Sequence, residues 1–187
     1  MNSKSNQIHS ESDLIQGCID QNPVMQRELY DRFASKMYGV CLRYAGNTND
    51  ADDVLQEGFI KVFKNISRFR SEGSFEGWIR RIFVNTCIEQ YRKKVKSYNI
   101  TEAHENSVED QDLDAMDRLA AKDMVKLINE LSPGYKAVFN LHVVEGYSHK
   151  EIADMLAISE GTSKSQLARA KGALKKLLET KYNQINS

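Results

Sequence analysis

The sequence predicts an all-α protein made of two small helical domains joined by a flexible acidic linker. Apolar residues recur at helical spacing over long segments, and no Asn-Gly or Asp-Gly pair separates alternating runs as it would in a β-hairpin. Proline, which breaks helices, occurs only twice in 187 residues. The linker is predicted from residues 102–117, where seven acidic side chains and no lysine or arginine give a composition typical of solvated chain.

These observations divide the chain into four parts. We expect a disordered tail over residues 1–10 and a first helical domain over 11–97. The acidic linker follows over 98–117, and a second helical domain covers 118–182. The chain is long enough for each of the two domains to bury a core of its own.

Composition excludes several classes of protein. No run of 18 apolar residues could cross a bilayer, and the polar residues 1–13 lack the apolar stretch of a signal peptide, so we expect a cytoplasmic protein without membrane insertion. The cysteines are isolated, which excludes a local zinc knuckle or redox pair, and we expect all three to be reduced and buried: Cys18, Cys41 and Cys87. No common nucleotide-binding or hydrolase motif occurs. The chain is therefore not expected to be an enzyme, and no catalytic residue, metal or cofactor is predicted.

Four helices are predicted in the first domain, over residues 11–20, 24–45, 49–66 and 75–95. Turn and capping residues separate them, namely Asn22-Pro23, Gly46-Asn47 and the segment 71–74. One face of the third helix is apolar and predicts a core stripe of Leu55, Phe59, Val62, Phe63 and Ile66.

The opposite face of this third helix is polar except for one residue. Asp53, Gln56 and Glu57 lie there at helical spacing, with Ile60 among them. An aliphatic side chain in such a place is either a tolerated exposed residue or the anchor of a protein-docking surface.

The fourth helix is apolar on two sides, so we expect it to lie centrally. Its polar strip consists of Arg81, Asn85 and Arg92, which fall within about 40° of one another at 100° per residue. The loop before it carries aromatic residues at both ends. Aromatic rings beside guanidinium groups suit unpaired bases, which stack on the rings while cations hold the phosphates; alternatively, Phe75 and Trp78 are plain core residues.

Basic residues are concentrated although the 26 basic and 26 acidic residues of the chain cancel. Residues 80–96 carry six lysines and arginines against one glutamate, and residues 164–181 repeat this balance. Two such regions suggest two contact sites on one nucleic acid. The alternative is that they merely solvate two helix ends.

The second domain begins with a predicted helix over residues 118–131, which buries Ala120, Met124, Leu127 and Leu131. Ser132 is expected to cap the next helix, with Pro133 at its first position and Gly146 at its end. The residues predicted to face inward are Val138, Phe139, Leu141 and His142, the last as a structural residue.

A helix-turn-helix pattern follows, with helices over residues 148–156 and 160–178 and the turn at 157–159. Ser159 caps the second helix, and Leu167 points inward. The outward residues can donate and accept hydrogen bonds at base edges and phosphates, and they are Thr162, Ser165, Gln166 and Arg169, flanked by Lys164.

Together the two domains resemble an extracytoplasmic-function sigma factor, the minimal two-domain class of the bacterial sigma-70 family. Residues 50–66, DADDVLQEGFIKVFKNI, resemble the family's polymerase-binding helix, and residues 75–94, FEGWIRRIFVNTCIEQYRKK, resemble its promoter-melting helix. Residues 131–174 resemble its helix-turn-helix, and the GTSKSQ form of the recognition helix is similar to members from Bacteroidota. Two residues depart from the family pattern: Ala157 replaces the usual glycine of the turn, and Ser163 stands where an inward valine is common.

The resemblance implies a protein that binds bacterial RNA polymerase core and promoter DNA, with an anti-sigma factor as a further partner. Core binding would fall to Asp53, Gln56, Glu57 and Ile60. Recognition and melting of the −10 element would fall to Ser71, Ser74, Phe75, Trp78, Arg81, Asn85, Arg92 and Lys93. Contacts to the −35 element would come from Thr162, Lys164, Ser165, Gln166 and Arg169. The N-terminal autoinhibitory region of larger sigma factors has no counterpart in the sequence, so we expect nothing in the chain itself to hold it inactive.

Two other functions are compatible with parts of the sequence. A stand-alone helix-turn-helix regulator would use the second domain, but it leaves the basic and aromatic helix over 75–95 unexplained. An anti-sigma or adaptor protein would only bind polymerase or a partner; the complete DNA-reading module and the missing HxxxCxxC zinc pattern count against it.

Overall fold

The computed structural model describes residues 9–98 and 124–185, and over these residues it is helical without any strand. The all-α prediction is confirmed. The predicted tail up to residue 8 and the predicted linker from residue 99 onward lie outside the described residues.

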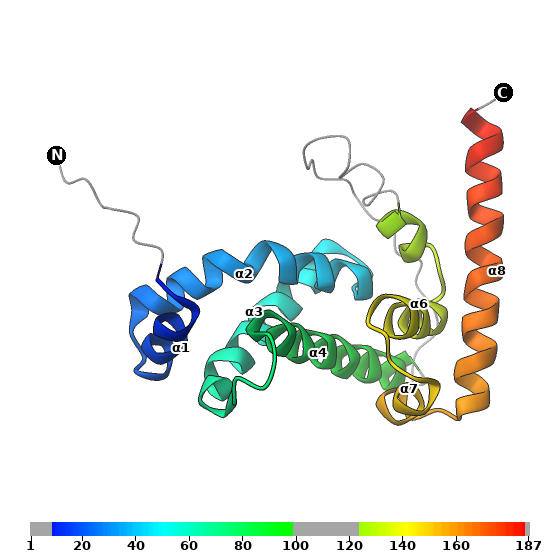
Figure 1. Ribbon diagram of the computed structural model, residues 1–187. Coiled ribbons are helices and arrows are strands. Elements are labelled where there is room, and N and C mark those ends of the chain that lie inside the picture. Colours follow the sequence, from blue (N-terminus) through cyan, green and yellow to red (C-terminus); the bar gives the residue numbers. More distant parts are fainter. Residues whose placement is uncertain (1–8, 99–123, 186–187) are drawn as a thin grey trace.

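The first domain contains four α-helices, α1 (Glu11–Ile19), α2 (Pro23–Tyr44), α3 (Thr48–Asn65) and α4 (Phe75–Tyr98), with a short 3₁₀ turn, η1 (Ile66–Arg68), after α3 (Figure 1). Each of the first three helices follows a residue whose side chain accepts a backbone N–H of the first turn: Ser10, Asn22 and Asn47. Such caps satisfy amide groups that have no partner inside the helix, which is why these helices begin where the sequence predicts.

Helix α4 lies centrally, as expected, because it is buried on two sides. Phe75, Ile79 and Phe83 are fully buried, and Val84, Cys87 and Ile88 are nearly so. Helices α2 and α3 both pack against it. All three cysteines are free and buried, which confirms the prediction for them.

The second domain begins with helical residues 124–129, followed by α6 (Pro133–Phe139), the π-helical turn η2 (Asn140–Val144), α7 (His149–Leu156) and the long α8 (Glu160–Ile185). Two predictions here are wrong. Met124, which was predicted to be buried, is 46% exposed. The face of this helix that packs against α8 carries Leu127 and Ile128 instead. Ser132 makes no side-chain cap, although Pro133 does start the helix as predicted.

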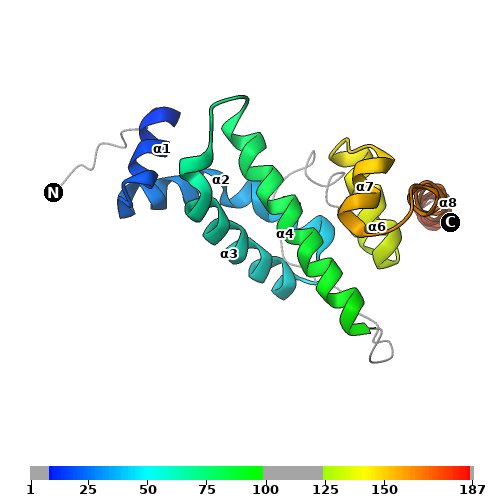
Figure 2. The same ribbon diagram turned by 90° about the horizontal axis from the view of Figure 1, so that it is seen from below.

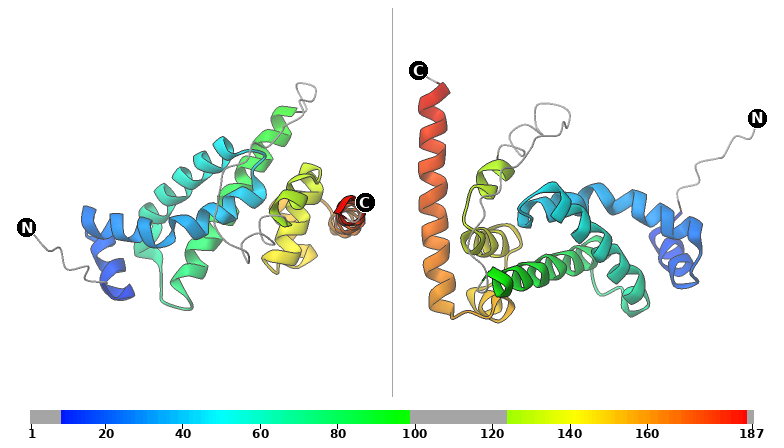
Figure 3. Two further views of the ribbon diagram at one scale, coloured as in Figure 1. Left: turned by 90° about the horizontal axis from the view of Figure 1, so that it is seen from above. Right: turned by 180° about the vertical axis from the view of Figure 1, so that it is seen from behind.

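The two domains pack against each other. Helices α6 and α7 lie between α4 and α8 (Figures 2 and 3), and α7 contacts α4 while α6 contacts α2. Buried apolar residues of both domains form one contiguous cluster, to which the second domain contributes Val138, Leu141 and Ile152 among others. The interface is therefore continuous with the core.

The two departures from the expected helix-turn-helix pattern have different structural consequences. Ser163 is fully buried, and its hydroxyl is hydrogen-bonded to His149 Nδ1 at 2.9 Å, so the polar side chain is satisfied. The ring of His149 stacks on that of His142, whose Nδ1 donates to the Tyr147 carbonyl at 2.9 Å. Ala157 adopts the left-handed conformation, with φ 55° and ψ 47°, which strains a residue that carries a Cβ.

Replacing Ala157 with glycine should stabilise the protein. Glycine avoids the Cβ clash of the left-handed conformation but loses more backbone entropy on folding, so the net gain in the free energy of unfolding should be about 0.5–1 kcal/mol. Urea unfolding followed by circular dichroism measures it. The matched control is Ala168→Gly at an exposed position inside α8, which should lose about 1 kcal/mol. Equal losses in both variants would show that the turn is not strained.

Candidate functional site

The polar face of α3 presents one exposed aliphatic side chain. Ile60 is 52% exposed, and Asp53 and Gln56 on the same face are also exposed. Glu57 is partly buried, accepts a hydrogen bond from Gln90 Nε2 at 2.6 Å and forms an ion pair with Lys61 at 3.1 Å. The structure therefore gathers all four predicted residues on one surface, which we call the Ile60 face (Asp53, Gln56, Glu57 and Ile60).

The charge of Glu57 is held in place by its neighbours. Burial by itself would raise the pKa of Glu57, but the hydrogen bonds from Lys61 and Gln90 outweigh it and lower that pKa below its usual value. Lys61 also binds Glu89 of α4 at 2.7 Å. A carboxylate fixed in this way sits beside an aliphatic group that is open to a partner, a combination that suits protein docking.

A second feature is the cavity between the loop before α4 and the first turns of that helix. It has a volume of ≈ 410 Å³, and its wall includes Trp78 together with three guanidinium groups, those of Arg68, Arg70 and Arg81. Ser71 and Gly73 both have positive φ angles, which bend the loop around this cavity. Glu72 also lines the cavity. An aromatic wall with several cations beside it can stack a base and hold its phosphates. Sequence reasoning missed Arg68 and Arg70, although Arg68 directly precedes the aromatic loop and Arg70 lies within it.

The structure corrects the expected role of Phe75. Its side chain is fully buried and cannot touch DNA. Its ring stacks on Trp78 with centroids 5.8 Å apart and packs edge-on against Phe33 of α2. Because Phe75 starts α4 on the side that faces α2, it supports Trp78 from beneath and leaves Trp78 partly exposed.

Of the other predicted −10 residues, Ser74 is exposed, but its hydroxyl accepts the backbone N–H of Gly77 at 2.9 Å and so caps α4. The remaining members are exposed on α4 and its loop: Ser71, Arg81, Asn85, Arg92 and Lys93. They continue from the cavity along the polar strip of the helix.

The helix-turn-helix is formed by α7 and α8, as predicted. A capping box of Ser148 and Glu151 starts α7, and Ser159 Oγ accepts the Thr162 N–H at 3.0 Å, which confirms the predicted cap of α8. The outward positions differ in exposure. Lys164, Ser165 and Arg169 are exposed, whereas Thr162 and Gln166 are half-buried.

Known proteins resemble this chain over both domains. Residues 29–97 match the family Sigma-70 region 2, and residues 121–174 match Sigma-70, region 4. The ECF RNA polymerase sigma factor SigW of Bacillus subtilis is 32% identical over 163 residues, which cover 81% of this chain and 87% of SigW. The ECF RNA polymerase sigma-E factor of Haemophilus influenzae is 31% identical, with 76% of this chain and 82% of that protein covered. This chain belongs to the extracytoplasmic-function sigma factors.

Two further comparisons agree with this assignment. SigE of Mycolicibacterium smegmatis is 30% identical over 156 residues, covering 81% of this chain and 60% of that protein. The fold is similar to that of the sigma factor RpoE of Bartonella quintana, solved in complex with the anti-sigma factor NepR, with a TM-score of 0.56 and 20% identity over 82% of this chain and 96% of RpoE.

The described part of the chain holds neither a membrane span nor a metal cluster. None of the helices within residues 9–98 and 124–185 is long and apolar enough to cross a membrane. Over the same residues, no three histidine, cysteine or acidic side chains gather where a metal ion could bind.

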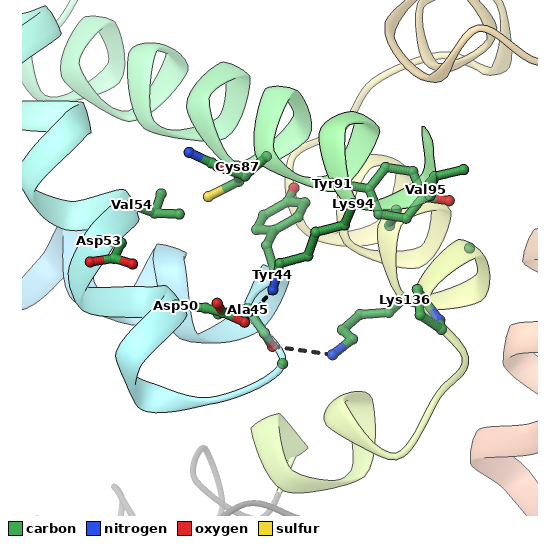
Figure 4. A pocket seen from close by; sticks show the side chains of 15 residues that line it. Tyr44, Ala45, Asp50, Asp53, Val54, Cys87, Tyr91, Lys94, Val95 and Lys136 are labelled. Carbon is green, nitrogen blue, oxygen red and sulfur yellow. Dashed lines mark hydrogen bonds and ion pairs between the residues drawn. The ribbon is translucent and has the colours of Figure 1, made fainter. Parts of the chain in front are cut away.

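Sequence reasoning missed the polar contacts between region 2 and region 4. Lys136 Nζ donates to the carbonyl of Ala45, just after α2, at 3.2 Å (Figure 4). Asn140 Nδ2 donates to the Arg43 carbonyl at 2.7 Å. Both side chains are buried. The inward face of this helix was predicted from its apolar residues alone, so these two polar residues were not included. The available signal was their i, i+4 spacing, which places them on one side of the helix.

The pKa of Lys136 is lower than that of an ordinary lysine. Burial lowers the pKa of Lys136 from its usual value to about 8; the positive charge of Lys94 adds to this effect and the carboxylate of Asp50 opposes it. The three residues line a cavity of ≈ 410 Å³ between region 2 and region 4 (Figure 4).

The free energy of unfolding should therefore rise with pH above about 8, where Lys136 has lost its proton in the folded chain but keeps it in the unfolded chain. Its pKa is about 8 in the folded chain and near its ordinary value when unfolded, so the stabilisation grows as pH rises above 8. Between pH 7.5 and 9.5 the free energy of unfolding should increase by about 2 kcal/mol relative to Lys136→Met, which cannot titrate. Urea unfolding of both proteins at the two pH values measures this, and parallel pH profiles would contradict it.

Proposed function

We propose that this sigma factor directs RNA polymerase to promoters by binding the core enzyme and both promoter elements. The observation that carries the proposal is the presence of both family regions in one chain, each with an exposed surface of suitable chemistry. Region 2 offers the Ile60 face and the cavity with its basic strip, and region 4 offers a capped recognition helix. A stand-alone regulator would need only the last of these.

Core polymerase would bind the Ile60 face. Asp53, Gln56 and Glu57 supply a polar rim of fixed charge around one aliphatic anchor, an arrangement typical of protein interfaces.

The −10 element would be opened and read at the cavity before α4. A base flipped from the strand would enter between Trp78 and the guanidinium groups of Arg68, Arg70 and Arg81. Asn85, Arg92 and Lys93 would then follow the phosphate backbone along α4. Phe75 and Trp78 would have different roles because they differ in burial. Phe75 supports the ring of Trp78 and would make no contact with DNA itself.

The −35 element would be read by the first turns of α8. Arg169 and Lys164 are exposed cations, and Ser165 offers a hydroxyl between them. Thr162 and Gln166 complete the face at its edge.

Further parts of the proposal follow from the function. A protein that works on polymerase and promoter acts in the cytoplasm, and it carries out no catalytic step and needs no cofactor. The similarity of fold to a sigma factor solved with an anti-sigma partner supports an anti-sigma factor for this chain as well. The GTSKSQ form of the recognition helix supports a member of the Bacteroidota type.

Run-off transcription with purified core polymerase tests the function. The chain should make transcription start at one position on a template that carries its promoter, whereas core polymerase alone should not. A stand-alone regulator would bind the template but would leave initiation by core polymerase non-specific.

Ile60→Glu should weaken binding to core polymerase by at least about 2 kcal/mol, because a charge at the centre of an interface removes the aliphatic anchor. Titration calorimetry or fluorescence anisotropy with labelled chain measures the affinity. Val24→Glu makes the same change at an exposed position of α2 and should leave affinity unchanged. Unchanged affinity in folded Ile60→Glu would refute the proposed face.

Arg81→Ala should weaken binding to a fork-junction DNA whose −10 region is already unpaired by about 1–3 kcal/mol, because the cavity still has to hold the base after strand separation. Fluorescence anisotropy of labelled DNA at fixed salt measures this. The control Arg27→Ala removes another exposed arginine, from α2, and should have little effect. Full rescue of Arg81→Ala by the unpaired template would mean that Arg81 acts only in melting.

A further inference from the structure

A largely apolar cavity of ≈ 410 Å³ lies between region 2 and region 4 (Figure 4). Apolar and aromatic side chains of α2, α3, α4 and α6 form much of its wall: Tyr44, Val54, Cys87, Tyr91, Val95 and Ala137. Val95 is 40% exposed, so it lies at the rim of the cavity. Cavities of this size and lining are the usual binding sites of small molecules.

Lys136 brings a buried amine to this wall without a carboxylate partner. It is only 7% exposed, and its Nζ donates to the Ala45 carbonyl and to Asn129 Oδ1, both at 3.2 Å. Both acceptors are uncharged, and Lys136 forms no ion pair within the described part of the chain. Asp50, whose charge acts on Lys136, is ion-paired with Lys94 instead. Because an ammonium group has three N–H donors, one donor of Lys136 is left for an anion in the cavity.

Tyr44 provides a second buried donor on the same wall. Its hydroxyl oxygen is buried and has no hydrogen-bond partner among the described residues. Burial raises the pKa of Tyr44, so the hydroxyl keeps its proton and can donate it to an acceptor. Two buried donors of one cavity therefore lack the same kind of partner, an oxygen acceptor, which for Lys136 should carry a negative charge.

We propose that this cavity binds a small monocarboxylic acid with a compact aromatic or aliphatic body. The carboxylate takes the free N–H of Lys136, an oxygen of the ligand takes the Tyr44 hydroxyl, and the body of the ligand lies against the apolar wall. Two acidic residues also line the cavity, but Asp50 is paired with Lys94, and Asp53 is exposed to solvent.

The ligand contacts both regions at once, because α6 belongs to region 4 and the other helices of the wall belong to region 2. No contact with polymerase or DNA is needed for this site, so it stands whether or not the proposed function does.

NMR titration of the full-length, ¹⁵N-labelled chain with 3-phenylpropionate tests the site. At about pH 7 the dissociation constant should be about 0.1–1 mM, as expected for a ligand of about eleven non-hydrogen atoms. The amide signals that shift should be those of residues that line the cavity. Titration without saturation, or shifts spread evenly over the chain, would overturn the proposal.

Three further probes separate the head group from the body. 3-Phenylpropanamide and 3-phenylpropylamine keep the body but lack the negative charge, and acetate keeps the charge but lacks the body. Each should bind at least about tenfold more weakly than 3-phenylpropionate, because each loses either the charge-assisted hydrogen bond or the apolar contact. Equal affinity for the amide or for acetate would overturn the proposal.

The affinity for 3-phenylpropionate should fall as pH rises, because Lys136 has to be charged to bind the carboxylate. The pKa of Lys136 is about 8 without ligand, so the dissociation constant should be about tenfold larger at about pH 9 than at about pH 7. Burial raises the pKa of Tyr44 and Tyr91, and these side chains stay protonated in this range. A hydrogen bond to Cys41, together with burial, does the same for Cys87. Equal affinity at the two pH values would overturn the proposal.

Matched variants locate the carboxylate. Lys136→Met should weaken the binding of 3-phenylpropionate at least about tenfold and abolish its pH dependence. The control Lys150→Met makes the same change at an exposed position of α7 and should alter neither.

A rim variant tests the site without touching a buried group. Val95→Glu places a negative charge at the rim of the cavity, so it should weaken the binding of 3-phenylpropionate about tenfold and should not weaken that of 3-phenylpropylamine. Val24→Glu makes the same change on α2 and should affect neither probe. Unchanged affinity for 3-phenylpropionate in folded Lys136→Met, or in Val95→Glu if Lys136→Met does not fold, would overturn the proposal.

Discussion

Helix α4 buries two apolar sides and keeps only a narrow polar surface, and the arrangement of the other elements follows from this constraint. One side packs through Phe75, Ile79 and Phe83, and the other through Val84, Cys87 and Ile88. Helices α2 and α3 have to cover both sides, so the helix becomes the centre of region 2. The polar strip that remains contains the cationic residues proposed for DNA, and Arg80, which region 4 binds, directly precedes Arg81 of that strip in the chain.

The distribution of charge along the chain matters more than its sum. A net charge of zero arises from basic helices and an acidic segment between them, so attraction to DNA is local. The same cations can also attract acidic side chains of the chain itself. Glu145 takes Arg80 and Arg43 in this way, and removal of either partner would leave charge buried without compensation. Arg80, which contacts region 4, and Arg81, which is proposed to contact DNA, are thus neighbours on one helix.

The helices and the recognition module were predictable because they depend on local chemistry. Ser10, Asn22, Asn47 and Ser159 cap helices as their residue types suggest, and the apolar stripe of α3 lies in the core. Predictions failed where neighbours decide between two local possibilities. Ser132 could have capped α6 but makes no such bond.

The sequence by itself determined the all-α class, the order of the two regions, and the residue types on the Ile60 face and on α8, because helical periodicity places side chains on faces without reference to the rest of the chain. Only the tertiary structure decided the fate of aromatic and polar residues at helix contacts. Phe75 is buried because α2 covers it, and Trp78 stays partly open because the described residues leave its outer face uncovered. Lys136, Asn140 and Glu145 acquire partners more than 60 residues away in the chain. No local pattern encodes such contacts, since they exist only when two separately predictable surfaces meet.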